Sequence, residues 1–146
     1  MQDRFKFRYV FKKDFGGKIG IRYKMPVFNL DDAVRSVFEN KIIEYTNFGY
    51  KLIAKNQSTG LKDKNGKLIY EGDIVRESFG ETGTYRVEYF PYSAEWQYVN
   101  LDDEKPNWEM FSIQFEGMSE NQGISTDLEI IGNIYENPEL IGGAEC

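Results

Sequence analysis

The sequence predicts one mainly β domain of the α+β class: a small bent sheet or SH3-like barrel with an N-terminal hairpin and one short helix. A chain of 146 residues can bury a single core without a disulfide or a metal ion. Aromatic residues make up 16% of the chain, and they favour strands. Short segments that alternate apolar and polar residues are separated by Gly, Pro, Asn and Asp, which is typical of small β domains.

The N-terminal segment is expected to form a hairpin. Between residues 4 and 12 the aromatic side chains fall on one side of an extended chain and the basic ones on the other, as in a half-buried strand. Gly16 and Gly17 supply a turn, and the alternation resumes through about Lys24. The basic side would form a stripe that consists of Arg4, Lys6, Arg8 and Lys12.

The period changes to that of a helix over residues 28–40, with Asn29 or Asp31 as the N-cap. The apolar runs at 41–46 and 50–55 flank Asn47 to Gly49 and predict a second hairpin. The alternative is a helix that continues through Ile43.

The remainder is expected to form the rolled sheet. Asp63, Asn65 and Gly66 fit a type I turn closed by a left-handed glycine, which predicts a hairpin. We divide the single domain into residues 1–57, a barrel-like core at 58–140 and a flexible tail at 141–146, with a mobile loop at 117–126. The predicted core strands are Asp73–Glu77, Tyr85–Tyr89, Trp96–Leu101, Phe111–Phe115 and Leu128–Tyr135.

Composition excludes much catalytic chemistry. The chain has no histidine, and its one cysteine is the last residue, so His-based nucleophile activation, His-ligated zinc and an intrachain disulfide are absent. The segment at 63–68 fits neither the EF-hand register nor a phosphate-binding loop. We therefore predict no enzyme activity, no metal and no cofactor, with a Mg²⁺ site made of carboxylates as the alternative.

No apolar run reaches the about 18 residues that a membrane span needs, and the N-terminus lacks a signal-peptide pattern. We expect a cytoplasmic protein. Trp96, Tyr98 and Trp108 are candidates for an aromatic binding surface, and the alternative is that they belong to the core.

Charge divides the chain. Residues 1–70 hold 15 Lys and Arg against 7 Asp and Glu, a net charge of +8, whereas residues 71–146 hold 3 against 17, a net charge of −14. The two halves can neutralise each other within one chain, or between copies that associate head to tail. A third alternative is an external partner, either nucleic acid on the basic stripe or a DNA-binding protein that the acidic half mimics.

Two segments carry a family resemblance. TGLKDKNGKLIYEGDIV, from Thr59 to Val75, and LEIIGNIYENPEL, from Leu128 to Leu140, resemble the YopX family of phage and prophage proteins. The RFKFR opening resembles the family more loosely, because Tyr9 and Val10 depart from its pattern. The resemblance implies a phage or prophage protein in a bacterial host cell, with no catalytic residues to transfer.

These observations predict an accessory protein that acts by protein–protein contact with a host or phage protein and self-associates as a homo-oligomer. The alternatives are nucleic-acid binding through the basic stripe and inhibition of a host protein by an acidic DNA mimic.

Overall fold

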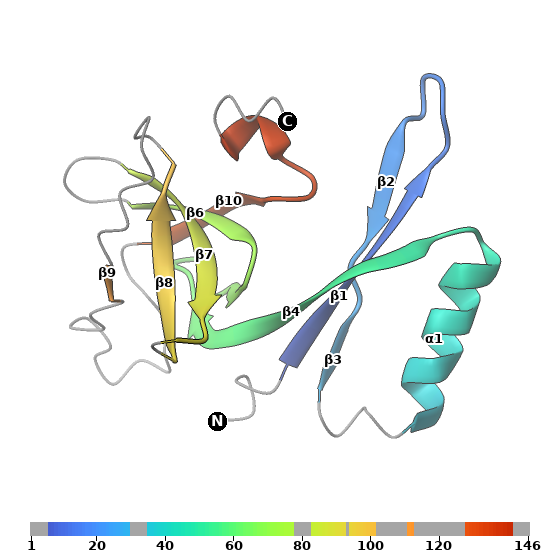
Figure 1. Ribbon diagram of the computed structural model, residues 1–146, viewed down its shortest axis with the longest axis horizontal. Helices are drawn as coiled ribbons and strands as arrows, with labels where there is room; N and C mark the ends of the chain where they lie inside the picture. The colour runs from blue at the N-terminus through green and yellow to red at the C-terminus, as the bar shows by residue number, and fades with distance from the viewer. Residues whose placement is uncertain are drawn as a thin grey trace. The chain divides into compact units, whose positions relative to one another are not determined.

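The computed structural model describes residues 6–29, 35–77, 83–92, 94–101, 111–112 and 128–141. The described chain is mostly β (Figure 1) and falls into two compact units, Met1–Ser58 and Thr59–Cys146. Its elements are β1 (Lys6–Asp14), β2 (Ile21–Lys24), β3 (Val27–Asn29), α1 (Arg35–Asn47), β4 (Lys51–Lys62), β5 (Leu68–Tyr70), β6 (Asp73–Glu77), β7 (Thr84–Phe90), β8 (Glu95–Asn100), β9 (Phe111–Ser112), β10 (Leu128–Asn133) and the short 3-10 helix η2 (Pro138–Ile141).

The first unit is built around β1. This strand pairs antiparallel with β2, β3 and β4, which confirms the predicted N-terminal hairpin. At Val10 and Phe11 the register with β4 shifts, so that Ile53 is an extra residue of β4. Val10 and Phe11 are both fully buried, and successive strand residues point to opposite faces. Both faces of β1 are therefore covered here, and the predicted division into one buried and one polar face is wrong.

The predicted strand at 41–46 is also wrong, because these residues lie inside α1; the alternative helix through Ile43 is confirmed. The helix ends at Asn47, and Gly49, two residues later, has φ +84°. The Gly49 N–H donates to the carbonyl of Thr46, and the Tyr50 N–H donates to that of Tyr45, both at 2.9 Å. This is a Schellman motif.

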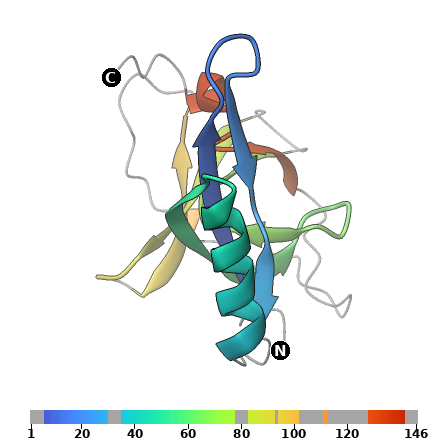
Figure 2. The same cartoon turned by 90° about the vertical axis from the view of Figure 1, so that its right-hand side faces the viewer.

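The start of the helix also differs from expectation. Asn29, one of the two predicted N-caps, lies in β3, a strand that the sequence pattern did not predict, and Asp31 lies outside the described residues. Figure 2 shows α1 lying along the sheet of the first unit. The Tyr45 ring contacts the Phe11 ring edge-on, with centroids 5.0 Å apart. This contact joins the helix to the central strand.

The second unit holds a five-stranded sheet in the order β10-β6-β7-β8-β9, and its strands curl in Figure 1, which confirms a small bent sheet. Its core cluster is Ile69, Val75 and Val87. The strands at 73–77, 84–90, 95–100 and 128–133 lie where they were predicted. The strand predicted at 111–115 is described only at 111–112, and the loop predicted at 117–126 lies outside the described residues.

No helix among the described residues is both long enough and apolar enough to cross a bilayer.

Candidate binding surface

The first segment that carries the resemblance is a structural turn. Asp63 is fully buried, and its Oδ1 accepts hydrogen bonds from the backbone N–H groups of Asn65 and Lys67, both at 2.9 Å. Its Oδ2 accepts from the N–H of Ile130 at 3.0 Å. Gly66 closes the turn at φ +79°, which confirms the predicted hairpin turn. The carboxylate therefore ties this turn to β10.

The second segment is a turn of the same kind. Oδ1 of Asn133 accepts from the N–H groups of Tyr135 and Glu136 at 3.0 and 2.9 Å. The Asn133 N–H donates to Oδ1 of Asn137 at 3.2 Å. A Cβ at Gly132 would lie 2.5 Å from that same Oδ1, so only glycine permits this close approach. The shared motifs hold the second unit together.

Gly132→Ala should lower the free energy of unfolding by about 2 kcal/mol, because the added methyl group must displace Asn137 from its hydrogen bond to Asn133. Urea denaturation of the variant beside the wild-type protein measures this. Gly16→Ala is the control for loss of a glycine: it occupies open space and tests only backbone strain at φ +67°. An unchanged urea midpoint for Gly132→Ala would contradict the steric account.

Within the described ranges, no group of three His, Cys, Asp or Glu side chains could hold a metal ion. The buried Asp73 accepts a hydrogen bond from the Tyr70 N–H at 2.8 Å, so it serves the β5–β6 turn.

The residues of the predicted basic stripe differ in their exposure to solvent. Arg4 lies outside the described residues. Arg8 is only 9% exposed, and the fully buried Val10 follows it on the same face of β1. Lys6 and Lys12, at the two ends of this face, are partly exposed. The three described residues therefore lie along one strand face, but its centre is buried.

The two described residues of the predicted aromatic surface are not fully exposed either. Trp96 and Tyr98 are partly buried and pack against the core cluster of the second unit, as the alternative interpretation expected, and Trp108 lies outside the described residues. The Tyr98 ring neighbours that of Tyr85, with centroids 6.1 Å apart. Burial, and secondarily the charge of Glu77, raises the pKa of the Tyr98 phenol well above its ordinary value.

The raised pKa of Tyr98 predicts that the protein loses stability in alkali. The folded protein keeps the phenol proton where the unfolded chain releases it, so the stabilisation is complete below about pH 10 and falls as the pH rises further, by up to about 1.4 kcal/mol per pH unit. Thermal unfolding from neutral to alkaline pH measures this, with Tyr98→Phe as the comparison. If both proteins lose stability equally above about pH 10, Tyr98 is not the cause.

A second group of cations lies on and beside the β1–β2 hairpin; it shares the partly exposed Lys12 with the predicted stripe, and its other members are exposed. The last partner pair of β1 and β4 is Lys12 with Lys51, whereas β1 and β2 stay paired as far as Asp14 and Ile21. The hairpin therefore extends beyond β4 as a two-stranded ribbon (Figure 1). We call the following residues the basic hairpin surface: Lys12, Lys18, Arg22, Lys24 and Lys51.

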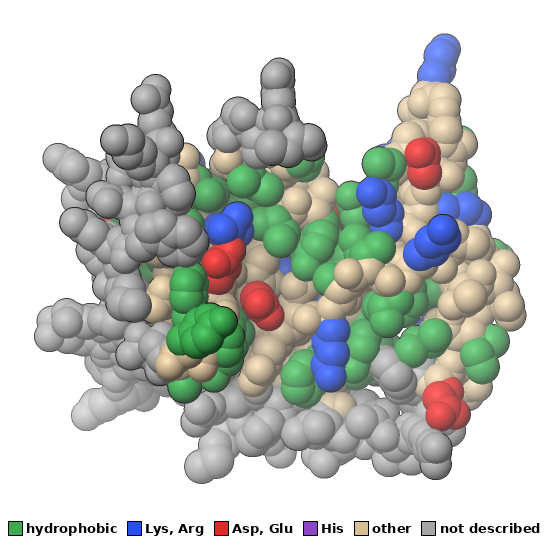
Figure 3. Space-filling model, viewed as in Figure 1, with side chains coloured by type: hydrophobic (Ala, Val, Ile, Leu, Met, Phe, Trp, Pro, Cys, Tyr) green, Lys and Arg blue, Asp and Glu red, His purple; other side chains and the backbone are tan. Residues whose placement is uncertain are grey.

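The cations of the basic hairpin surface are not neutralised by any residue that the structure describes, since none of them forms an ion pair with one. Lys12 faces Lys51 directly across β1 and β4, and like charges at such positions destabilise a sheet. Figure 3 shows Lys and Arg side chains over this hairpin. An anionic partner would relieve the repulsion between them.

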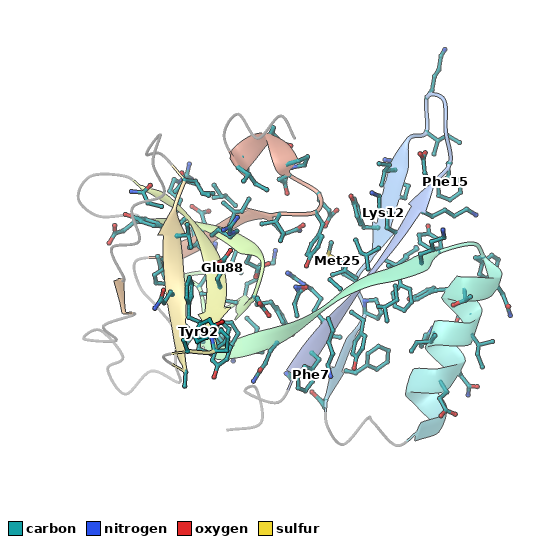
Figure 4. All side chains as sticks on the ribbon, viewed as in Figure 1. Phe7, Lys12, Phe15, Met25, Glu88 and Tyr92 are labelled. Atoms are coloured by element: carbon teal, nitrogen blue, oxygen red, sulfur yellow. The ribbon has the colours of Figure 1, made fainter. Side chains whose placement is uncertain are left out.

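Exposed apolar side chains accompany these cations. Phe15, Ile19 and Ile21 are 43%, 55% and 42% exposed, and Figure 4 shows Phe15 on the hairpin. Lys13 lies nearby but has internal partners: its Nζ donates to the carbonyl of Phe48 at the end of α1 and lies 4.4 Å from the Phe15 ring centroid. The hairpin thus presents positive charge and apolar area together.

Sequence reasoning missed this surface, although a signal was present. Residues 12–24 contain five basic residues and one acid. The basic surface was nevertheless predicted at residues 4–12, because basic and aromatic residues alternate strictly there. Pairing with β4 decides the exposure. Residues 7–12 of β1 are paired with β4, and most of them also have a neighbour in β3 or β2 on the other edge, whereas the ribbon beyond Lys12 has none on the β4 side.

The chain was compared with known proteins. No curated protein shows significant sequence similarity to it. The sequence profile of the YopX protein family matches residues 19–142, a span that includes both turns built around Asp63 and Asn133. Since this match covers most of the chain, the protein belongs to the YopX family.

Proposed function

We propose that this YopX-family protein is a non-enzymatic accessory protein of a phage or prophage, which acts in the bacterial cytoplasm by protein–protein contact. The basic hairpin surface carries the proposal, because its cations have no described partner in the chain. A projecting ribbon with unneutralised charge favours an anionic partner.

The apolar residues favour a protein over a nucleic acid as that partner. Ile19 and Ile21 are aliphatic and exposed, and aliphatic side chains offer no planar face on which a base could stack. The exposed Phe15 ring of the hairpin already has a partner, since Lys13 Nζ lies 4.4 Å from its centroid. Single-stranded nucleic acids are held by aromatic side chains together with a positive groove. Apolar area that is rimmed by charge is instead typical of protein interfaces.

Affinity capture from host cells tests this function. Nuclease-treated lysate is passed over the wild-type protein and over Arg22→Glu/Lys24→Glu. The charge reversal should abolish retention of acidic proteins, because two cations of the hairpin become anions. Lys41→Glu/Lys67→Glu is the matched control, since it makes the same charge change at two exposed positions outside the hairpin.

The function is contradicted if both variants retain the same proteins as the wild type. Circular dichroism of each variant must match the wild-type spectrum, so that loss of retention reports the surface and not unfolding.

Nucleic-acid binding is the second candidate, and the same unpaired cations favour it. It predicts retention of a DNA or RNA fragment that weakens steeply with salt and is lost in Arg22→Glu/Lys24→Glu. Lys6→Glu tests the predicted stripe separately, because Lys6 lies on the partly buried face of β1 and is not part of the basic hairpin surface. Retention that neither variant alters would exclude both surfaces.

A further inference from the structure

We infer that the partner of the basic hairpin surface includes a second copy of this chain, and that the hairpin of one copy docks on the turn end of the β7–β8 hairpin of the next. This inference rests on the proposed function and names the occupant of its surface. Contact between two different surfaces is head to tail, and it produces a ring or an open chain of copies.

The β7–β8 turn end offers exposed aromatic rings. Tyr92, in the turn, is fully exposed, and Tyr89 is 39% exposed; Figure 4 labels Tyr92 at this end of the hairpin. The Tyr89 ring packs edge-on against Trp96 of the paired strand, with centroids 5.2 Å apart. Trp96 in turn packs against the core cluster. The Tyr89 ring is thus fixed by its contact with Trp96, which is itself anchored on the core.

These two tyrosines stand out in their unit. Among the described residues from Thr59 onward, Tyr89 and Tyr92 are the large apolar side chains that are exposed. The exposed apolar residues of the β1–β2 hairpin would gain from burial against an apolar counterpart, and the acidic unit offers one at this end of β7 and β8.

Charge complements this match. Residues 1–58 hold 12 Lys and Arg against 6 Asp and Glu, a net charge of +6. Residues 59–146 hold 6 against 18, a net charge of −12. Opposite net charges on the two units steer association between copies and disfavour contact between like units.

Aromatic faces also bind cations, and this chain already makes such contacts. The Lys55 Nζ lies 4.4 Å from the Phe7 ring centroid, and Lys13 lies at the same distance from Phe15. Arg22 or Lys24 placed over the face of Tyr92 would repeat that chemistry between copies. Ile19 and Ile21 would pack beside Tyr89 and lose their exposure to water.

Sedimentation velocity over a wide concentration range tests the inference. The wild-type protein should sediment as multiples of the 17.0 kDa chain. Arg22→Glu/Lys24→Glu changes the basic hairpin surface, which we call the donor surface of the contact between copies. Tyr92→Ser changes the turn end of the β7–β8 hairpin, which we call the acceptor surface, at a fully exposed position. Each should weaken self-association by at least about tenfold, because like charges or a lost cation–π contact replace the match. Lys41→Glu/Lys67→Glu should associate like the wild type.

Mixing the two variants gives the decisive result. A donor variant keeps its acceptor surface and an acceptor variant keeps its donor surface, so an equimolar mixture should form a dimer with one copy of each and nothing larger. A wild-type protein that stays monomeric at every concentration would overturn the inference. So would a mixture that stays monomeric while the wild type assembles.

The outcomes separate this inference from the proposed function. If the protein stays monomeric but captures other proteins through an intact hairpin, the function stands and the second copy is the wrong partner. If capture does not depend on the hairpin, the proposed function itself fails.

Discussion

Asp63→Asn should lower the free energy of unfolding by about 3 kcal/mol, because this substitution removes one of two acceptor oxygens from a fully buried carboxylate. Oδ1 accepts two backbone hydrogen bonds within the turn, and Oδ2 accepts one from Ile130 of β10. An asparagine retains one oxygen and presents an NH₂ group in place of the other. Whichever way the amide turns, N–H groups then face N–H groups.

Urea denaturation followed by tryptophan fluorescence measures this loss. Asp14→Asn is the matched control, since Oδ1 of Asp14 also accepts a backbone N–H, that of Gly16 at 2.8 Å, but on an exposed turn. It should change stability by less than about 0.5 kcal/mol. Equal losses in the two variants would show that burial of Asp63 is not what makes its hydrogen bonds important.

Phe11→Ala should cost about 4 kcal/mol, because it empties the space of a fully buried ring at the centre of the first unit. Phe11 is paired with Lys24 of β2 and Leu52 of β4, and its ring contacts Tyr45 of α1. The variant therefore loses the aromatic contact between the helix and β1 as well as apolar burial. Amide hydrogen exchange in α1 should accelerate more than exchange in β6 and β7.

Phe48→Ala is the control for this variant. It removes the same ring next to the end of α1, at a position that is 65% exposed, and should cost less than about 1 kcal/mol. If α1 exchanges no faster in Phe11→Ala than in Phe48→Ala, the contact between Phe11 and Tyr45 does not anchor the helix.

Local signals predicted the elements whose determinants lie close together in sequence. The hairpin turn at Asp63, Asn65 and Gly66 follows from the conformations that these three residues adopt. The strand at Asp73–Glu77 follows from its apolar pattern and the glycine before it, and its observed limits agree residue for residue. Neither depends on which distant segment lies beside it.

Prediction from the sequence failed where contacts with distant residues decide the secondary structure or the burial of a segment. Residues 41–46 contain two consecutive isoleucines, which favour a strand, yet they form the end of α1. Gly49 could have signalled the helix end, but the contact that joins this segment to β1, the Tyr45 ring against the Phe11 ring with centroids 5.0 Å apart, brings together residues that are far apart in sequence. In β1, Val10 and Phe11 point to opposite faces and are both buried, so packing on the two faces of the strand overrides the alternation that predicted one polar face.

The candidate site shows the same division. Composition and charge by themselves removed histidine-based chemistry and separated a basic from an acidic half, since these are properties of the residues and need no coordinates. Only the tertiary structure decided which cations are available, because exposure depends on strand pairing: Arg8 is buried where β1 has neighbours on both edges, whereas Arg22 is exposed where the ribbon extends beyond β4. The sequence therefore determined that the protein carries a basic surface, and long-range pairing determined where that surface lies.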